Sequence, residues 1–247
     1  MNKNLLSKLR AHRQSGKKGF ALLLDPDKLT IENLSTIVPK AKELHVDFIF
    51  FGGSLMLSDT VEESLDYIKN ECEIPVILFP GNPSQVNEKA DGLFFLSLIS
   101  GRNSEMLIGH HVVSAPIIKK MNIEVLPTGY ILIDGGNVTS VSYISNTTPI
   151  PSGKADIAAC TAMAGEMLGL KIMYMDAGSG ARNPIPSKTI QAVHSNTDCP
   201  VIVGGGIKTV EQAVSACQAG ADVVVVGNAI ESNPELMEEL IDAVHKS

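Results

Sequence analysis

The chain contains no tryptophan, and aromatic residues make up only 4% of its 247 residues. We therefore expect a mainly aliphatic core, which suits the Val-, Ile- and Leu-rich strands of a buried parallel sheet. Basic residues are also few, because 20 of them face 27 acidic residues and leave a formal net charge of −7. Nucleic acid binding needs a basic footprint, so this balance argues against a nucleic acid partner. It does not exclude a small phosphorylated ligand, which backbone amides can bind inside an acidic protein.

Paired cysteines and long apolar runs are absent as well. The four cysteines show no CxxC pairing and no histidine at zinc-finger spacing, so we expect reduced, mostly buried thiols in a cytoplasmic protein. The basic first 19 residues lack the apolar segment of a secretory signal. No apolar run reaches the roughly 18 residues that a membrane span needs. A lipid substrate would therefore be met by peripheral contact with the membrane or in a groove.

Short apolar runs that end in Gly, Asp or Pro recur along the whole chain. Each is too short for a buried helix and is bounded by turn residues, so we expect eight strands. The fifth run is broken at Pro127 and Gly129. The eight runs are Phe20–Leu24, Asp47–Phe51, Pro75–Phe79, Gly92–Leu98, Ile123–Ile133, Lys171–Met175, Pro200–Val203 and Asp222–Val226.

Helix-like stretches lie between these runs. Ile31–Leu44 and Thr209–Ala219 carry apolar residues at helical spacing, with Thr209 as a candidate N-cap and Gly220 just beyond the second helix. Further helices are expected over Asp156–Leu168 and Pro234–His245.

Strands that alternate with helices predict a parallel α/β fold, of which a closed barrel is the simplest form. We therefore expect a single-domain (β/α)8 TIM-barrel-like fold over residues 1–247, a usual length for that fold. The pattern is irregular around residues 99–115. The connection Asn137–Lys154 is long for a loop between a strand and a helix, and such loops are often functional.

Three glycine-containing turns follow the last three predicted strands. They are Asp176–Gly180, Gly204–Gly206 and Gly227–Asn228. In a barrel these turns lie side by side at the C-terminal end, which is a recurrent phosphate site. Glycine lets the backbone approach a ligand closely, and successive N–H groups form a nest for an anion. The three turns together predict a phosphate-binding site.

The first two strands end in residues that suit a metal ion. Asp25 follows the first strand and Ser54 follows the second. A carboxylate and a hydroxyl on adjacent strands suit Mg²⁺, which usually takes one or two protein ligands and completes its shell with water and phosphate oxygens. The alternative is that Asp25 caps the turn with Pro26 and that Ser54 caps a helix. Spacing alone does not separate these two roles.

Five motifs in this order resemble the geranylgeranylglyceryl phosphate synthase family, which also contains the bacterial heptaprenylglyceryl phosphate synthases. The glycine motifs alone occur in many phosphate-binding barrels, whereas their combination with LDPDK, GGS and AGSGA is specific. GYILIDGG and SNTTPIP are similar to the second, larger group of the family. The five motifs are FALLLDPDK (Phe20–Lys28), FFGGS (Phe50–Ser54), YMDAGSGA (Tyr174–Ala181), VGGGI (Val203–Ile207) and VVGNAI (Val225–Ile230).

The resemblance implies a reaction in which a polyprenyl diphosphate alkylates the 3-hydroxyl of sn-glycerol 1-phosphate and releases diphosphate. It implies that Asp25 and Ser54 bind Mg²⁺ and that the protein is a homo-oligomer, a dimer or a hexamer. It places the glycerol phosphate site on Tyr174, Met175, Asp176, Ala177, Gly178, Ser179, Gly180, Gly205, Gly206, Gly227 and Asn228.

One residue departs from the family pattern, which usually reads YLEAGSG with glutamate as the base. Here Asp176 stands at that place, one methylene shorter, and a displacement of about 1 Å can cost much of the rate. We expect Asp176 to accept the proton of the acceptor hydroxyl directly, through a water, or after a small backbone shift. Tyr174 is expected to hydrogen-bond the substrate, the alternative being a packed aromatic side chain. His110 and His111 point apart on most elements, so we expect structural or oligomer contacts there.

Two other functions compete with prenyl transfer. One is a different phosphate-binding barrel enzyme, such as a sugar-phosphate isomerase or a thiamin-phosphate-type synthase. The other is a catalytically inactive barrel that only binds a phosphorylated metabolite, a possibility that Asp176 raises.

Overall fold

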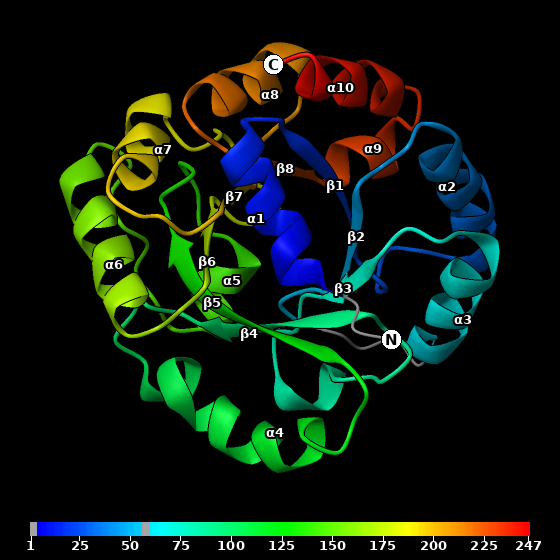
Figure 1. The fold of residues 1–247 in the computed structure, drawn as a ribbon, viewed down its shortest axis with the longest axis horizontal. Helices are drawn as coiled ribbons and strands as arrows, with labels where there is room; N and C mark the ends of the chain where they lie inside the picture. Colours follow the sequence, from blue (N-terminus) through cyan, green and yellow to red (C-terminus); the bar gives the residue numbers. More distant parts are fainter. Residues whose placement is uncertain (1–3, 56–59) are drawn as a thin grey trace.

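The computed structural model describes residues 4–55 and 60–247. Its eight strands pair in parallel in sequence order, and β1 pairs with β8 to close the barrel (Figure 1). The closed barrel surrounded by helices confirms the predicted fold. The strands are β1 (Gly19–Leu24), β2 (Phe48–Phe51), β3 (Val76–Leu78), β4 (Gly92–Ser97), β5 (Glu124–Leu132), β6 (Ile172–Asp176), β7 (Val201–Gly204) and β8 (Val223–Val226).

The helices mostly follow the apolar periodicity of the sequence. Thr209 caps α8 as expected, since its side chain accepts a hydrogen bond from the Gln212 N–H. No helix among the described residues is long and apolar enough to cross a membrane. The α-helices are α1 (Leu5–Ser15), α2 (Ile31–Glu43), α3 (Val61–Glu71), α4 (His110–Ile118), α5 (Ser140–Ile144), α6 (Ala155–Met167), α7 (Ser187–His194), α8 (Val210–Gln218), α9 (Asn228–Ser232) and α10 (Leu236–His245).

The alternation of strand and helix is interrupted between β3 and β4. Residues 79–91, all of them described, contain only the 3-10 turn η1 (Pro83–Gln85) where an α-helix would usually cover the barrel. The irregular region expected around residues 99–115 holds a π-helical turn, η2 (Glu105–Gly109), that leads into α4. These two departures leave one flank of the barrel covered by short elements.

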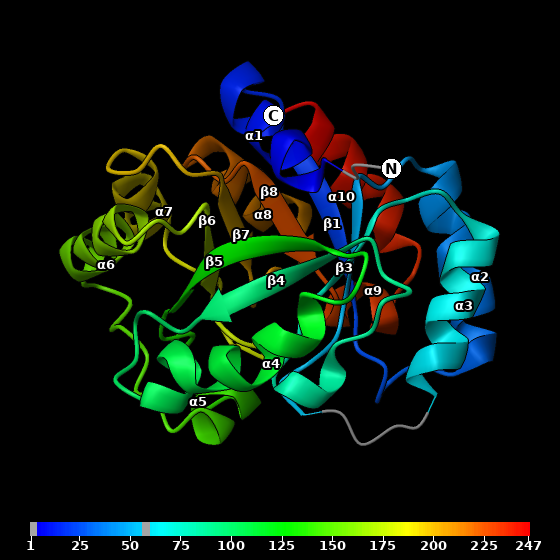
Figure 2. The ribbon, with the colours of Figure 1, turned by 60° about the horizontal axis from the view of Figure 1, so that its bottom comes forward.

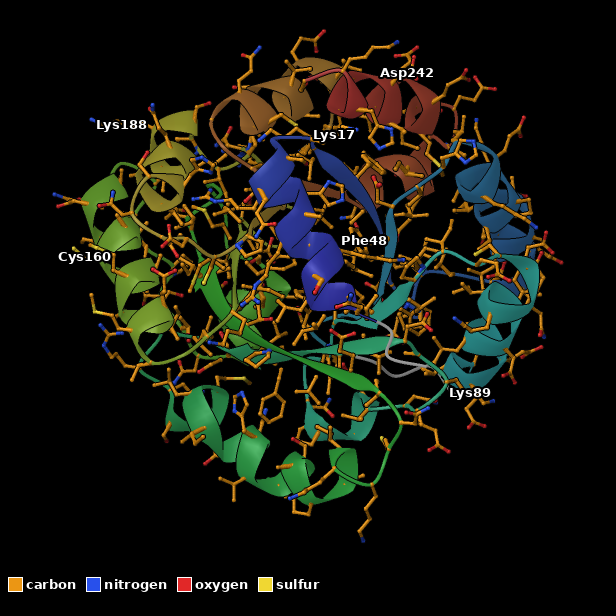
Figure 3. All side chains as sticks on the ribbon, in the orientation of Figure 1. Lys17, Phe48, Lys89, Cys160, Lys188 and Asp242 are labelled. Carbon is orange, nitrogen blue, oxygen red and sulfur yellow. The ribbon has the colours of Figure 1, made fainter. Side chains whose placement is uncertain are left out.

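The buried core is mainly aliphatic, as the sequence predicted, but aromatic side chains gather inside the barrel, which composition alone did not indicate. Phe48, Phe50, Phe94, Tyr130 and Tyr174 belong to the buried inner cluster. Figure 3 shows Phe48 within the ring of strands, whereas Lys89, Lys188 and Asp242 lie at the outer rim. Scarcity in the composition did not reveal this placement, because a few bulky rings are enough to fill a barrel interior. The layer between strands and helices is mainly aliphatic, with Phe20 and Phe51 as its buried aromatic residues.

Strand β5 runs without a break through Pro127 and Gly129, contrary to the interruption that the sequence suggested. Pairing with β6 begins at Thr128, one residue after Pro127. The Pro127 carbonyl accepts a hydrogen bond from the Lys171 N–H at 2.8 Å. Because proline sits just before the β5–β6 ladder starts, its missing N–H removes no ladder hydrogen bond.

Helix α1 closes the N-terminal end of the barrel, across the centre of the ring in Figure 1 and opposite α5 in Figure 2. Leu5 and Leu9 are buried in the inner cluster. The Glu124 carboxylate at the start of β5 accepts the N–H groups of Leu5 and Leu6, at 2.7 and 3.0 Å. An acidic group at a helix N-terminus is stabilising. The other end of the barrel stays open.

Candidate active site

A cavity of about 740 Å³ occupies the open, C-terminal end of the barrel. Residues from the ends of β1, β2, β6, β7 and β8 line it, so the two predicted sites are parts of one space. The predicted residues that line it are Asp25, Ser54, Tyr174, Asp176, Gly178, Ser179, Gly180, Gly205, Gly206, Gly227 and Asn228.

The turn after β7 is shaped by glycine. Gly205 has φ +82°, in the left-handed region that glycine favours. A Cβ at this position would lie 2.5 Å from the Asp176 Oδ1 atom and 2.7 Å from the backbone nitrogens of Ala177 and Gly178. The turn after β7 therefore packs directly on the turn after β6. This close approach brings the backbone amides of both turns to one wall of the cavity, as an anion cradle requires.

Ser179 and Asn228 join the turns after β6 and β8. The Asn228 side-chain amide donates to the Ser179 Oγ at 3.2 Å. Lys208, just before α8, also lines this part of the cavity. The cradle therefore combines backbone amides, the start of α8 and a cation, all of which favour a phosphate. We define the cradle by Gly178–Gly180, Gly205–Gly206 and Gly227–Asn228.

Lys28 connects the cradle to the carboxylate at the end of β1. Its Nζ lies 3.0 Å from the Asn228 Oδ1 and 3.4 Å from the Ser179 Oγ. The same ammonium group lies 3.1 Å from the Asp25 Oδ2 and 4.0 Å from the Glu231 Oε2. A single cation thus contacts both predicted sites, and an anion in the cavity would meet it from either side.

The carboxylate end of the cavity contains Asp25, Ser54 and Glu231. Asp25 lies close to the β2 turn, because a Cβ on Gly53 would be 3.2 Å from its Oδ1 atom. The backbone N–H of Asp25 hydrogen-bonds Glu231, and burial raises the pKa of the Glu231 carboxyl. The residues that the structure describes hold no cluster of three or more His, Cys, Asp or Glu suited to a metal ion. One carboxylate and a nearby hydroxyl fit Mg²⁺ only when a substrate supplies further oxygens.

Asp176 is buried and lines the cavity. Its Oδ2 accepts a hydrogen bond from the Tyr130 hydroxyl at 2.5 Å, and its Oδ1 accepts the Gly178 N–H at 2.7 Å. Burial raises the pKa of the Asp176 carboxyl, while these two donors oppose the shift. Burial also raises the pKa of Tyr130 well above its ordinary value, so the phenol stays protonated and donates.

Successive side chains at the end of β6 point alternately into the barrel and out toward the helices, so the other residues of the YMDAGSGA motif lie on two different faces. Tyr174 points into the barrel, lines the cavity and stacks on Phe79 with ring centroids 4.9 Å apart. Met175 and Ala177 are buried in the layer between strands and helices and are absent from the lining of the cavity. Their side chains face away from a ligand, because neighbouring residues of a strand point to opposite faces.

A second, apolar cavity of about 100 Å³ adjoins the first. Gly53, Ser54 and Phe79 line both cavities, so the apolar space opens beside the carboxylate end. It lies under η1, η2, α4 and α5, on the flank where the β3–β4 connection lacks an α-helix. His111 lines it, packs edge-on against Phe95 with centroids 4.3 Å apart, and has no hydrogen-bond partner for its Nδ1. His110 lines the same space. Among the described residues, neither histidine belongs to a group of three or more His, Cys, Asp or Glu side chains that could hold a metal ion.

Sequence reasoning did not assign Tyr130, Lys208 or Glu231 to the site. Tyr130 lies within the GYILIDGG motif, which was noted only as a resemblance, and Glu231 follows the VVGNAI motif by one residue. The long loop after β5 also belongs to the site, because Ser140 lines the large cavity and Val141 lines the apolar one. Its length was the signal for this role.

The fold and the cavity define a (β/α)8 barrel with a phosphate-type anion cradle at its C-terminal end. The chain belongs to the PcrB family, whose model matches residues 12–247. This confirms the resemblance seen in the motifs.

Curated relatives and a solved structure agree with the family. The chain is 54% identical over 99% of its length to the geranylgeranylglyceryl phosphate synthase of Chitinophaga pinensis, 97% of which is covered. It is 40% identical over 90% of its length to that of Methanosphaera stadtmanae, 92% of which is covered. The crystal structure of (S)-3-O-geranylgeranylglyceryl phosphate synthase from Thermoplasma acidophilum, in complex with substrate sn-glycerol-1-phosphate, matches 98% of this chain and 99% of its own. Its TM-score is 0.92 and its sequence identity 30%.

Proposed function

We propose that this protein transfers a polyprenyl group, of the geranylgeranyl type, from its diphosphate to the 3-hydroxyl of sn-glycerol 1-phosphate and releases diphosphate. The observation that carries this proposal is the single cavity in which a glycine cradle, a buried carboxylate and an acidic, lysine-bearing end meet. Such a reaction needs two anionic substrates held side by side, and this cavity offers each of them a separate binding region. The named relatives and the substrate complex of the Thermoplasma acidophilum protein support it.

The cradle would hold the phosphate of sn-glycerol 1-phosphate. In that position the glycerol part lies toward Asp176, which lines the same cavity. Its carboxylate would accept the proton of the attacking hydroxyl, and short hydrogen bonds to fixed donors hold it in place for this role. Tyr174, packed beside it with its ring buried, would limit the space left for the glycerol carbons.

Asp25 and Ser54 would hold Mg²⁺ together with the diphosphate oxygens of the prenyl donor. When bound, the ion would neutralise charge that develops on the leaving diphosphate. Lys28 would share this task, because its ammonium group already lies 3.1 Å from Asp25 and faces the cavity.

The apolar cavity beside Ser54 would receive the prenyl chain. Its volume of about 100 Å³ is below the roughly 300 to 1,000 Å³ of ordinary ligand pockets, so a long chain requires its walls to move apart. The walls that would have to move are the short elements η1, η2 and α5, which replace regular helix on this flank. A π-helical turn such as η2 is frequently found at functional sites.

A homo-oligomer is part of the proposal. Four exposed apolar side chains on η2 and α4 support it, since monomers rarely leave such clusters in water. They are Ile108, Val112, Val113 and Ile117. Light scattering on the purified protein tests this part, and a monomeric mass would contradict it.

The activity is tested by mass spectrometry of the products formed from sn-glycerol 1-phosphate and a series of prenyl diphosphates, with Mg²⁺ or with EDTA. We expect an ether product whose formation stops in EDTA, and the best donor reports the chain length. No product from any donor, with glycerol 1-phosphate still bound in calorimetry, would indicate an inactive binding barrel. Absence of binding would indicate another phosphate-binding barrel enzyme.

A further inference from the structure

The hydrogen bond between Tyr130 and Asp176 links two buried side chains on neighbouring strands. Tyr130 pairs with Tyr174 in the β5–β6 register. Asp176 lies two residues further along β6 and therefore points to the same inward face. The phenol therefore reaches toward the cavity to meet the carboxylate at 2.5 Å. Tyr130 is 5% exposed and Asp176 is 8% exposed.

Asp176 needs such a partner for two physical reasons. Its side chain is short, and each of its oxygens must be aimed if the acceptor hydroxyl is to lie within hydrogen-bond reach. It is also buried, and burial favours the neutral acid, which cannot accept a proton. The Gly178 N–H fixes one oxygen from the backbone of the following turn. Among the described residues, Tyr130 supplies the one side-chain hydrogen bond to this carboxylate.

We propose that Tyr130 is a positioning residue for prenyl transfer, because its hydroxyl orients the short carboxylate of Asp176 and keeps it ionised. This inference rests on the proposed function, in which Asp176 accepts the proton. In that step the acceptor oxygen bonds to the first carbon of the prenyl group, and the bond from that carbon to the diphosphate oxygen breaks. The bonding electron pair leaves with diphosphate, and the hydroxyl proton passes to Asp176. Tyr130 keeps its own proton throughout.

Among the groups around Asp176, Tyr130 is the side chain whose replacement should most change the pKa of the Asp176 carboxyl. The neutral phenol of Tyr174 is the other titratable group on β6, and β7 presents only the backbone of Gly204 to its partner Asp176. The charged side chains that line the cavity (Asp25, Lys28, Lys208 and Glu231) make no hydrogen bond or ion pair with Asp176 among the described residues. A change at position 130 should therefore be visible in the pH dependence of turnover.

The test is the pH profile of kcat/KM in the Tyr130→Phe variant, which removes one oxygen atom. We expect the acidic limb to move to higher pH by about one unit or more, since a hydrogen bond to a charged group is lost. Binding of glycerol 1-phosphate in calorimetry should change little, because the cradle is intact. Tyr67→Phe, the same change on the outer helix α3, is the matched control and should leave the profile in place.

The results distinguish a positioning role of Tyr130 from a packing role, and both from a failure of the proposed function. A uniform loss of rate at every pH with no shift of the limb would overturn the positioning role and leave a packing role. If Tyr130→Phe does not fold, 3-fluorotyrosine at position 130 replaces it. The more acidic phenol is a stronger donor, so the limb should then move to lower pH, and an unmoved limb would again overturn the inference. Full turnover in Asp176→Asn would instead remove the base on which the proposed function depends.

Discussion

At the N-terminal end of the barrel three aspartate carboxylates bind backbone N–H groups and basic side chains of the protein itself. At the C-terminal end the carboxylates line a cavity. Asp47, Asp91 and Asp222 each accept the N–H of a residue at the start of a strand, Phe20, Val76 and Val201, at 2.8 Å. Each also faces a basic side chain. These partners are His245 at 2.8 Å, Lys69 at 2.7 Å and Arg13 at 3.6 Å.

The carboxylates at the C-terminal end differ from these because they line the cavity. Asp25, Asp176 and Glu231 line a cavity of about 740 Å³ that Lys28 and Lys208 also line. The same residue type therefore stabilises one end and is available for chemistry at the other, as is usual in barrels of this fold. Changes at the closed end should alter stability and leave activity per folded molecule, and changes at the open end should do the reverse.

The largest effect is expected from Gly205→Ala at the open end. The added methyl group would strain a residue with φ +82° and press on the turn after β6, 2.5 Å from the Asp176 Oδ1. We expect affinity for glycerol 1-phosphate, measured by calorimetry, to fall about a hundredfold or more. Gly169→Ala is the control, since its φ of +96° gives similar strain but its Cβ would meet nothing within 4 Å. Equal losses in both variants would show that strain alone weakens binding.

Next in size is Arg13→Leu at the closed end. Arg13 donates to the carbonyls of His194 and Thr197 at 2.8 and 2.6 Å, and it is the cation beside buried Asp222. Its loss removes two carbonyl hydrogen bonds and the ion-pair partner of that carboxylate, so we expect the free energy of unfolding to fall by about 2 kcal/mol in urea titrations. Lys246→Ala, which breaks the exposed pair with Asp242, should leave the free energy of unfolding nearly unchanged. A large loss of kcat in folded Arg13→Leu would contradict the separation of the two ends.

The smallest effect is the pH dependence of the pair between His245 and Asp47. The Asp47 carboxylate raises the pKa of His245 above its ordinary value of 6.5. Its stabilisation is therefore fully present below pH 6.5 and disappears as the pH rises through the raised value. The pair is partly exposed, so we expect roughly 0.5 kcal/mol or less. Melting curves of the wild type and His245→Gln should converge at high pH, and a constant difference would refute the pairing.

Much of the fold could be predicted because its signals are local. The apolar runs predicted the eight strands, and the glycine turns predicted that the ends of β6, β7 and β8 would meet. The three turns do line one cavity. The Mg²⁺ role of Asp25 and Ser54 stays a prediction, as do the cytoplasmic location, the oligomeric state and the catalytic and substrate-binding roles of all the other predicted site residues.

What the sequence did not predict depends on contacts between distant positions. Tyr130 and Asp176 are 46 residues apart, and Lys28 and Asn228 are 200 apart. Whether such side chains touch is decided by strand register and by which face each residue presents, neither of which shows in a local pattern. The aromatic interior escaped prediction for the same reason, because composition counts rings without placing them.

We propose that Asp176 accepts the proton and that the glycine cradle binds the phosphate. The Asp176→Asn variant tests this separation most directly, with glycerol 1-phosphate binding and turnover measured on the same preparation. Asparagine keeps the size of the side chain and removes the charge that accepts the proton. We predict that kcat falls about a hundredfold or more while the dissociation constant changes by less than about threefold. Unchanged kcat would contradict the account, and so would a parallel loss of binding, which would make Asp176 a structural support of the cradle.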